Sequence, residues 1–232
     1  MKTPEELAVL DLNAPLVMDM LRTVEGAIAS GVSEREILAE MAATMVRGGA
    51  EYLATTTVCS GPNTNPWRAE ATARRLEEGD LVFVDTDTVG IEGCFFCVSR
   101  TFAVGEPTSA HRTTYGAAHA WLTEMKALIR PGTTCGELAA AAPAIPERFV
   151  PQRYECMVHG IGFEEENPSV CHPQDRQSNP ETVLEVGTVL VVECYMGEVG
   201  GDHGVKLGDQ VVVTEDGCRT LVPYPWSDAL LG

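Results

Sequence analysis

Several side chains that could bind a divalent metal ion are spread along this chain. Asp85 and Asp87 belong to the segment Val-Asp-Thr-Asp, His159 to Val-His-Gly-Ile-Gly and Glu193 to Val-Val-Glu-Cys. Because Asp85 and Asp87 are two residues apart, they lie on one face if their segment is a strand. Two like charges on one face favour a cation between them, although solvated carboxylates at the end of a strand would also explain the pattern.

Glu193 is unusual because of its neighbours. Residues 189–192 are all valine or leucine, so Glu193 is expected inside an apolar strand. A carboxylate in such surroundings needs a partner or a metal ion, or it must bind a proton. The alternative is an inward-facing carboxylate that accepts hydrogen bonds from the backbone.

The first fifty residues are expected to be helical. In Thr3–Glu6 and in Ser33–Glu36, a Ser or Thr precedes a Glu by three residues, which is the pattern of a capping box. Pro15 is expected to end the first helix near Asn13 and to open a second one, because proline removes an N–H group from a helix interior. The helix that opens at Ser33 is expected to end at Gly48, where glycine favours a C-cap.

Strands and helices share the rest of the chain. Apolar, β-branched runs predict strands, and apolar residues at helical spacing predict helices. The expected strands are Tyr52–Cys59, Leu81–Asp85, Phe95–Phe102, Thr188–Tyr195, Gln210–Thr214 and Cys218–Val222. The expected helices are His111–Leu128 and Thr134–Ala142, and the polar stretch Glu164–Pro180 is expected to be a loop. Because helices come first and strands gather later, the sequence predicts an α+β fold.

Composition limits the class of protein. The chain has 232 residues, 44% of them hydrophobic, and a formal net charge of -18. Such a charge repels phosphate backbones and anionic lipids, so neither nucleic acid nor a membrane is an expected partner. The N-terminus has the pattern of an acidic amphipathic helix and not of a signal peptide, and the 8 scattered cysteines are expected to be reduced thiols in the cytoplasm.

The segments Glu78–Asp85, Ser99–Phe102 and Val213–Gly217 resemble, in this order, motifs of the pita-bread superfamily of creatinase, aminopeptidase P and methionine aminopeptidase. The resemblance implies a curved antiparallel sheet covered by helices, in two halves related by a pseudo-two-fold axis. It covers nearly the whole chain. Residues 1–232 are therefore expected to form one domain of the catalytic type, without the N-terminal domain that many members carry, and to assemble as a homodimer.

The resemblance also implies a set of metal ligands. In this superfamily two divalent ions activate a water molecule between them, and carboxylates bridge the ions. Asp85, Asp87, His159 and Glu193 match ligand positions by motif. A lone histidine is more often a hydrogen-bonded structural residue, but the motif around His159 favours a ligand or catalytic role.

Two positions of that ligand set are altered. Cys97 stands where a bridging Asp is usual, and Gly208 stands where a bridging Glu is usual. Cys97 could be a thiolate ligand for zinc or iron, or a small buried thiol that fills the space of a lost carboxylate. Gly208 offers no side chain, and Asp209 should point to the opposite face of its strand. The expected cofactor is iron, zinc or manganese, with fewer than two ions or none.

A narrower resemblance is to the dimethylsulfoniopropionate lyases built on this fold. It rests on Ser60–Trp67, on Gly204–Leu207 and on the spacing between Tyr154 and His159. It implies that Glu165, six residues after His159, is the general base and that Tyr154 is a second catalytic residue.

Two further residues are expected to bind substrate. Trp67 could face a sulfonium group through a cation–π interaction, and Lys206 could bind a substrate carboxylate. Each candidate also has a simpler explanation. Trp67 and Tyr154 could be core aromatics, Lys206 could line a surface strand, and Glu165 could belong to a solvated acidic loop.

The sequence thus predicts an enzyme that acts on a small molecule, a lyase or a hydrolase, with a reduced or absent two-metal site. Creatinase works on this fold without a metal ion, so ligand loss is compatible with catalysis. The alternative is a non-catalytic relative that binds a small molecule or a protein in the same cleft. A Xaa-Pro peptidase fits less well, because residues 163–168 contain no histidine and the pair 67–68 is Trp-Arg where peptidases place one.

Overall fold

The computed structural model describes residues 1–67 and 70–232, and for Glu165 and Glu166 it describes the backbone alone. The strands are β1 (Tyr52–Leu53), β2 (Thr57–Ser60), β3 (Leu81–Val89), β4 (Phe95–Ala103), β5 (Cys156–Ile161), β6 (Glu165–Cys171), β7 (Val189–Gly197), β8 (Gly204–Val213) and β9 (Cys218–Thr220). The helices are α1 (Pro4–Ala27), α2 (Glu34–Arg47), α3 (Ser109–Leu128), α4 (Cys135–Ala141) and α5 (Asp228–Leu231), with short 3-10 turns η1 (Gly61–Thr64), η2 (Ile91–Gly93) and η3 (Glu147–Gln152).

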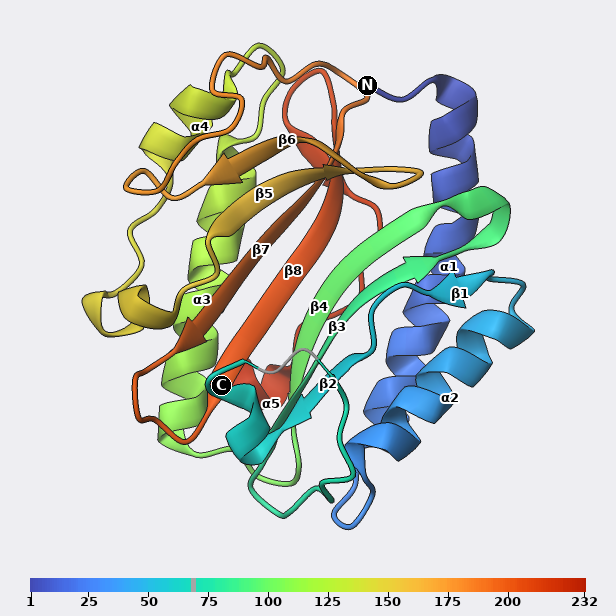
Figure 1. The fold of residues 1–232 in the computed structure, drawn as a ribbon, viewed down its shortest axis with the longest axis vertical. Helices are drawn as coiled ribbons and strands as arrows, with labels where there is room; N and C mark the ends of the chain where they lie inside the picture. Colours follow the sequence, from blue (N-terminus) through green and yellow to red (C-terminus); the bar gives the residue numbers. More distant parts are fainter. Residues whose placement is uncertain (68–69) are drawn as a thin grey trace.

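The strands form one antiparallel sheet with helices packed on it, so the α+β prediction is confirmed (Figure 1). The strand order is β1-β3-β4-β8-β7-β5-β6, with β2 paired to β3 and β9 paired to β8. Helices α1 and α2 pack against the half of the sheet that contains β2, β3 and β4, and α3 and α4 pack against the half that contains β5 to β8.

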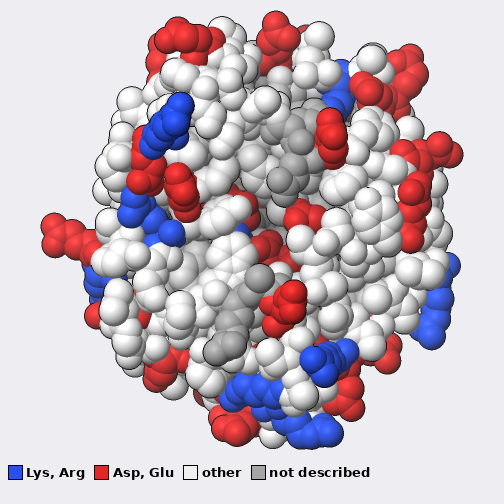
Figure 2. All heavy atoms as spheres, viewed as in Figure 1, with Lys and Arg blue, Asp and Glu red and all other residues white. Residues whose placement is uncertain are grey.

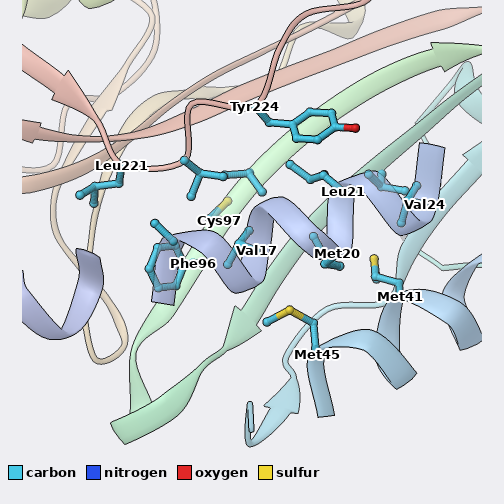
Figure 3. Packing of buried hydrophobic residues seen from close by; sticks show 14 of the residues in the cluster. Val17, Met20, Leu21, Val24, Met41, Met45, Phe96, Cys97, Leu221 and Tyr224 are labelled. Carbon is cyan, nitrogen blue, oxygen red and sulfur yellow. The ribbon is translucent and has the colours of Figure 1, made fainter. Parts of the chain in front are cut away.

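Each half has its own apolar core. Figure 3 shows part of the first one, where Val17 and Leu21 of α1, Met41 and Met45 of α2 and Phe96 of β4 belong to one cluster. All of these side chains are 0% exposed. Full burial of one such side chain contributes about 1.5–3 kcal/mol, so these helices are held to the sheet mainly by apolar contact.

The two halves meet where β4 lies beside β8, a junction that we call the β4–β8 seam. Its register contains the pair Ser99 and Gly208. Side chains add to the bonding here: Thr101 Oγ1 donates to the Lys206 carbonyl at 2.8 Å, and Arg100 Nη1 donates to the Gly208 carbonyl at 2.7 Å. The seam therefore depends on particular side chains as well as on backbone pairing.

Most predicted elements are present with small changes at their ends. The strands predicted at Leu81–Asp85 and Thr188–Tyr195 are the longer β3 and β7, and the helix predicted at His111–Leu128 is α3. The segment Tyr52–Cys59 forms two short strands, β1 and β2, with a break between them.

The prediction that the first helix ends near Asn13 is wrong, because α1 continues through Pro15. The side chain of Asn13 is buried, donates to the Val9 carbonyl at 2.8 Å and accepts from the Ile91 N–H at 2.7 Å. The buried side chains between Leu10 and Val24 give the main reason, because a break at Pro15 would separate them from the core.

The prediction of a loop at Glu164–Pro180 is wrong in part, because β6 lies within it. β6 pairs with β5, a strand that the sequence analysis did not identify, and two register shifts interrupt the pairing. β6 is at the edge of the sheet, where proline is tolerated in a strand, so Pro168 and the polar residues around it disguised the strand.

Figure 2 shows the face of the molecule that Figure 1 shows as a ribbon. Acidic side chains are scattered over this face, and some lie inside a hollow near its centre, over the sheet. Among the described helices, none combines the length and the apolar character needed to cross a bilayer.

A buried carboxylate attaches α2 to the segments that flank β2. Glu34 is 0% exposed, and it accepts hydrogen bonds from Ser60, Asn63 and Thr72 at 2.6–2.9 Å. Burial alone would raise the pKa of Glu34, but these donors, with Thr72 foremost, lower it below its usual value of 4.5. The folded state therefore favours the ionised carboxylate.

Glu34→Gln should lower the free energy of unfolding by about 2–3 kcal/mol near neutral pH, because the amide presents N–H groups to donors that need an acceptor. Since the folded pKa lies below the unfolded value, the advantage of the wild type is complete above pH 4.5 and is lost as the pH falls through the folded pKa. Urea unfolding of both proteins at a series of pH values measures this.

Glu40→Gln, at an exposed position of α2, is the control, and we expect it to change stability by less than about 0.5 kcal/mol. A difference between Glu34→Gln and the wild type that stayed constant from neutral to acid pH would contradict the assignment.

Candidate active site

A cavity of about 380 Å³ lies on the sheet and receives residues from both halves. β3 and β4 supply one side, and β5 and β7 supply the other. Its lining residues are Thr55, Thr56, Thr57, Trp67, Glu70, Asp85, Asp87, Cys97, Tyr154, His159 and Glu193. The residues that the sequence predicted as metal ligands are all among them.

Asp85, Cys97 and Glu193 come closest to one another. Each offers one potential ligand atom, and these atoms lie within 4.8 Å of one another. His159 joins them, with Nε2 3.5 Å from Oε1 of Glu193. Asp87 lies opposite Cys97 in the register of β3 and β4. The structure thus brings these side chains together, and their role as ligands stays a prediction.

Lys206 lies beneath this cluster and is its positively charged partner. The sequence predicted contact of Lys206 with a substrate carboxylate, not with these side chains. Its ammonium Nζ is 2.5 Å from Oε2 of Glu193 and 3.5 Å from Oδ2 of Asp85. The Lys206 side chain is 0% exposed, whereas that of Asp85 is 13% exposed. The carboxylates that Lys206 meets are therefore those of the protein itself.

Two aromatic rings cover the same ammonium group. Nζ of Lys206 is 4.2 Å from the ring centroid of Trp67 and 3.9 Å from that of Tyr154. Trp67 and Tyr154 contact each other edge to face, with centroids 5.1 Å apart, and Tyr195 lies 6.0 Å from Trp67. Cation–π attraction adds to the two ion pairs, so the ammonium is held on several sides.

The pKa values follow from this geometry. Burial favours the neutral amine, but Asp85 and Glu193 outweigh it and raise the pKa of Lys206. Burial also opposes ionisation of Glu193, yet the nearby ammonium and His159 lower the pKa of Glu193 to about 2. Asp85 is farther from the ammonium, and there burial prevails and raises the pKa. Lys206 and Glu193 are therefore the charged pair on which this site depends.

Cys97 is a neutral thiol in these surroundings. Burial, the carboxylate of Asp87 and then those of Glu193 and Asp85 raise the pKa of Cys97 well above 9.0. Figure 3 shows Cys97 beside Phe96 in the packed core under α1, and its side chain also lines the cavity. Both explanations from the sequence, ligand and space-filling thiol, are compatible with this position.

Gly208 lies directly opposite Ser99 at the seam and opposite Glu193 in β7. A Cβ atom at position 208 would be 3.0 Å from Ser99 Oγ and 3.2 Å from the Cβ of Glu193. Ser99 Oγ donates to Oδ1 of Asp85 at 2.5 Å. The sequence analysis missed Ser99, although its spacing of two from Cys97 places it on the same face of a strand.

Asp209 points away from the cavity, as its one-residue offset from Gly208 predicted. Its oxygens accept from Arg100 at 2.8 Å and from Lys126 at 2.6 Å. It is 2% exposed, so this ion pair belongs to the interior on the other face of β8. Asp209 cannot replace the missing carboxylate.

The contacts of the carboxylates decide how many metal ions the site can hold. Asp85 accepts from Ser99 with Oδ1 and faces Lys206 with Oδ2, while Glu193 accepts from Lys206 with Oε2 and faces His159 with Oε1. Each of these oxygens therefore has a partner within 3.5 Å. Gly208 has no side chain that could bridge a second ion, so the described residues around Asp85 and Glu193 do not fit a two-ion centre.

The other predicted residues lie at or near the same cavity, or outside the described side chains. Trp67 and Tyr154 line the cavity, and Lys206 is covered by their rings. Glu165 begins β6 opposite Ile161, but its side chain lies outside the part of the chain that the structure describes. The catalytic and substrate-binding roles of these residues stay predictions.

Comparison with known proteins gives the family context. A family model described as metallopeptidase family M24 matches residues 14–215. The dimethylsulfoniopropionate lyase DddP of Roseovarius nubinhibens is 36% identical over 204 residues, which cover 86% of this chain and 46% of that lyase. The Xaa-Pro dipeptidase of Pyrococcus furiosus is 29% identical over 226 residues, which cover 95% of this chain and 62% of the dipeptidase.

Solved structures agree on the fold. The prolidase from Pyrococcus horikoshii matches with a TM-score of 0.86 at 24% identity, over 98% of this chain and 64% of the prolidase. This match confirms the predicted pita-bread fold. The chain spans about half the length of the lyase and less than two thirds of the dipeptidase.

Gly208→Ala tests how closely β8 approaches β4 and β7. Because the added Cβ would lie 3.0 Å from Ser99 Oγ, we expect the free energy of unfolding to fall by about 1–3 kcal/mol. Combining it with Ser99→Gly should recover part of this loss, with a coupling of about 1 kcal/mol in a double-mutant cycle from urea unfolding.

Gly116→Ala in α3 is the matched control, since its Cβ would meet nothing within 4 Å. It should stabilise the protein by up to about 1 kcal/mol. Strict additivity of the two seam substitutions would show that Ser99 and position 208 do not compete for space.

Proposed function

Because the chain belongs to metallopeptidase family M24, we propose that it is a small-molecule lyase or hydrolase with a reduced metal site or none, and that dimethylsulfoniopropionate is the first substrate to test. The similarity to the lyase DddP supports the choice of substrate. The observation that carries the proposal is one cavity lined by carboxylates and aromatic rings, with the ammonium of Lys206 buried against both.

The cavity suits a small cation. Its volume of about 380 Å³ is in the range of small-molecule sites. Glu193 pairs with the single positive charge of Lys206, and Asp85, Asp87 and Glu70 add further carboxyl groups to the lining. The resulting negative potential favours a substrate with a sulfonium group.

In the proposed reaction, Glu165 is the general base. Its carboxylate takes the proton from the carbon next to the substrate carboxylate. The electrons of that C–H bond form the C=C bond of acrylate, and the C–S bond breaks with its electron pair leaving on dimethyl sulfide. The proton on Glu165 then returns to water, which closes the cycle.

Tyr154 is proposed to bind the substrate carboxylate. Burial, and secondly the charge of Glu193, raise the pKa of its phenol, so the O–H group is retained. A neutral phenol can donate a hydrogen bond where negative charge develops during proton abstraction. Tyr154 thus stabilises the transition state without taking part in proton transfer.

Trp67 and Lys206 complete the proposed substrate site. Trp67 lines the cavity, but Lys206 already lies over its ring, so a sulfonium group would meet the remaining ring surface. Lys206 has 0% exposure and two carboxylate partners, which favours charge balance over direct contact with substrate as its role.

The proposal includes at most one ion of iron, zinc or manganese. Asp85, Cys97 and Glu193 would hold it, with His159 close by. Such an ion would supply a Lewis acid when bound. We further propose a homodimer in the cytoplasm that acts on a small molecule and not on nucleic acid or membranes, in keeping with the net charge of -18.

A non-catalytic protein that binds a small molecule or a protein partner is the second candidate. It is favoured by the same contacts that leave no free carboxylate oxygen between Asp85 and Glu193. A Xaa-Pro peptidase is the third, supported by the dipeptidase relative but weakened by the glycine at position 208.

Headspace measurement of dimethyl sulfide over the purified chain tests the lyase. The wild type should release dimethyl sulfide and acrylate in equal amounts, and Glu165→Gln should lower kcat by about 100-fold or more, because general-base catalysis typically contributes that much. Glu164→Gln, at the exposed neighbouring position, is the control and should retain most of the activity.

Full activity of Glu165→Gln would rule out the base assignment. No release by the wild type, with calorimetric binding of the sulfonium compound, would favour the binding protein. Release of proline from Xaa-Pro dipeptides instead would identify a peptidase.

A further inference from the structure

The ammonium group of Lys206 lies close to the carboxylates of Asp85 and Glu193, where the fold implies a metal ion. We propose that the ammonium of Lys206 is the resident cation of this site, that it excludes a divalent ion, and that its removal turns Asp85, Cys97 and Glu193 into a site for one metal ion. The inference concerns the site to which the proposed function assigns catalysis. Metal binding is measured separately from turnover, so either proposal can fail alone.

The positive charge of Lys206 lies close to both carboxylates. Nζ of Lys206 is within 3.5 Å of oxygens from both Asp85 and Glu193, which come from different halves of the sheet. The remaining oxygens of these carboxylates face Ser99 and His159. A divalent ion held by both carboxylates would lie close to the ammonium of Lys206, which would repel it at short range.

The buried side chain of Lys206 cannot easily move away from these carboxylates. Its side chain is 0% exposed, and the rings of Trp67 and Tyr154 cover Nζ at 4.2 and 3.9 Å. Its backbone is fixed to Thr101 by hydrogen bonds in both directions, at 2.8 and 3.2 Å. An ion cannot displace this ammonium without opening the aromatic cover and leaving a buried cation unpaired, which is costly.

Removal of the ammonium group would leave the carboxylates without their partner. Asp85 and Glu193 would then be two buried carboxylates without their cation, an arrangement that attracts a divalent ion. Their ligand atoms and that of Cys97 already lie within 4.8 Å of one another. Zinc takes such ligands at about 2.0–2.3 Å, so small side-chain rotations would complete the shell, with His159 within reach as a fourth ligand.

A purely structural ion pair would behave differently. If Lys206 only stabilises the fold, its removal should weaken the protein and create no metal site. If Lys206 replaces a metal ion, removal should create one. Metal stoichiometry and a spectroscopic signature of Cys97 separate these cases, because neither depends on stability.

The test uses Lys206→Met, which keeps an unbranched side chain one atom shorter and removes the charge. Apo protein is titrated with Zn²⁺ by calorimetry and with Co²⁺ by absorption spectroscopy. Lys206→Met should bind one Zn²⁺ per chain at least about 100-fold more tightly than the wild type, since it no longer carries the competing charge. Its Co²⁺ form should show a near-ultraviolet thiolate charge-transfer band that Lys206→Met/Cys97→Ala lacks.

The control is Lys126→Met, which removes another ammonium group, the one that donates to Asp209 at 2.6 Å on the other face of β8. It should bind metal no better than the wild type. Lys206→Arg, which retains the positive charge, should also resemble the wild type.

One tightly bound Zn²⁺ per wild-type chain, with the thiolate band in the Co²⁺ form, would overturn the inference whatever the catalytic result. Failure of folded Lys206→Met to bind an ion would overturn it as well. If Lys206→Met does not fold, the wild-type and Lys206→Arg titrations decide, because the inference requires both to bind no tight ion.

Discussion

The buried ion pair between Lys206 and Glu193 is the interaction on which the rest of the site depends. It joins β7 to β8, and the weaker contact of Lys206 with Asp85 extends it to β3 in the other half of the sheet. Burying charges costs several kcal/mol per ion unless partners compensate, and here carboxylates and aromatic faces compensate together. The ionisation of Glu193 follows from where this ammonium lies, and the rings of Trp67 and Tyr154 cover the same group.

Strand β8 carries a charge cluster on each face. On one face, Lys206 pairs with Glu193 beneath the cavity. On the other face, Asp209, three residues later, pairs with Arg100 and Lys126. Gly208 lies between them and has no side chain, which lets β4 and β7 come close to it. The alternation of a strand thus keeps the two clusters apart, so a change in one should leave the other in place.

The sequence predicted much of the fold, because the apolar runs of β3 and β7 and the capping boxes of α1 and α2 are local signals. It failed at Pro15, where burial of a long apolar face outweighed a local preference, and at β6, whose polar edge gives no alternating pattern. The resemblance to the pita-bread superfamily also implied which acidic groups share a cavity. The partners of Lys206 could not be predicted, because they depend on how the two halves of the sheet approach each other.

The β4–β8 seam has one more consequence. Asp85 belongs to one half of the molecule and Glu193 to the other, and the seam between them relies on side chains such as Thr101 and Arg100. Any shear of one half against the other must therefore change the separation of the carboxylates around the ammonium. The site is mechanically coupled to the alignment of the whole sheet, so a distant substitution that tilts one half would alter its affinity for ligands without touching it.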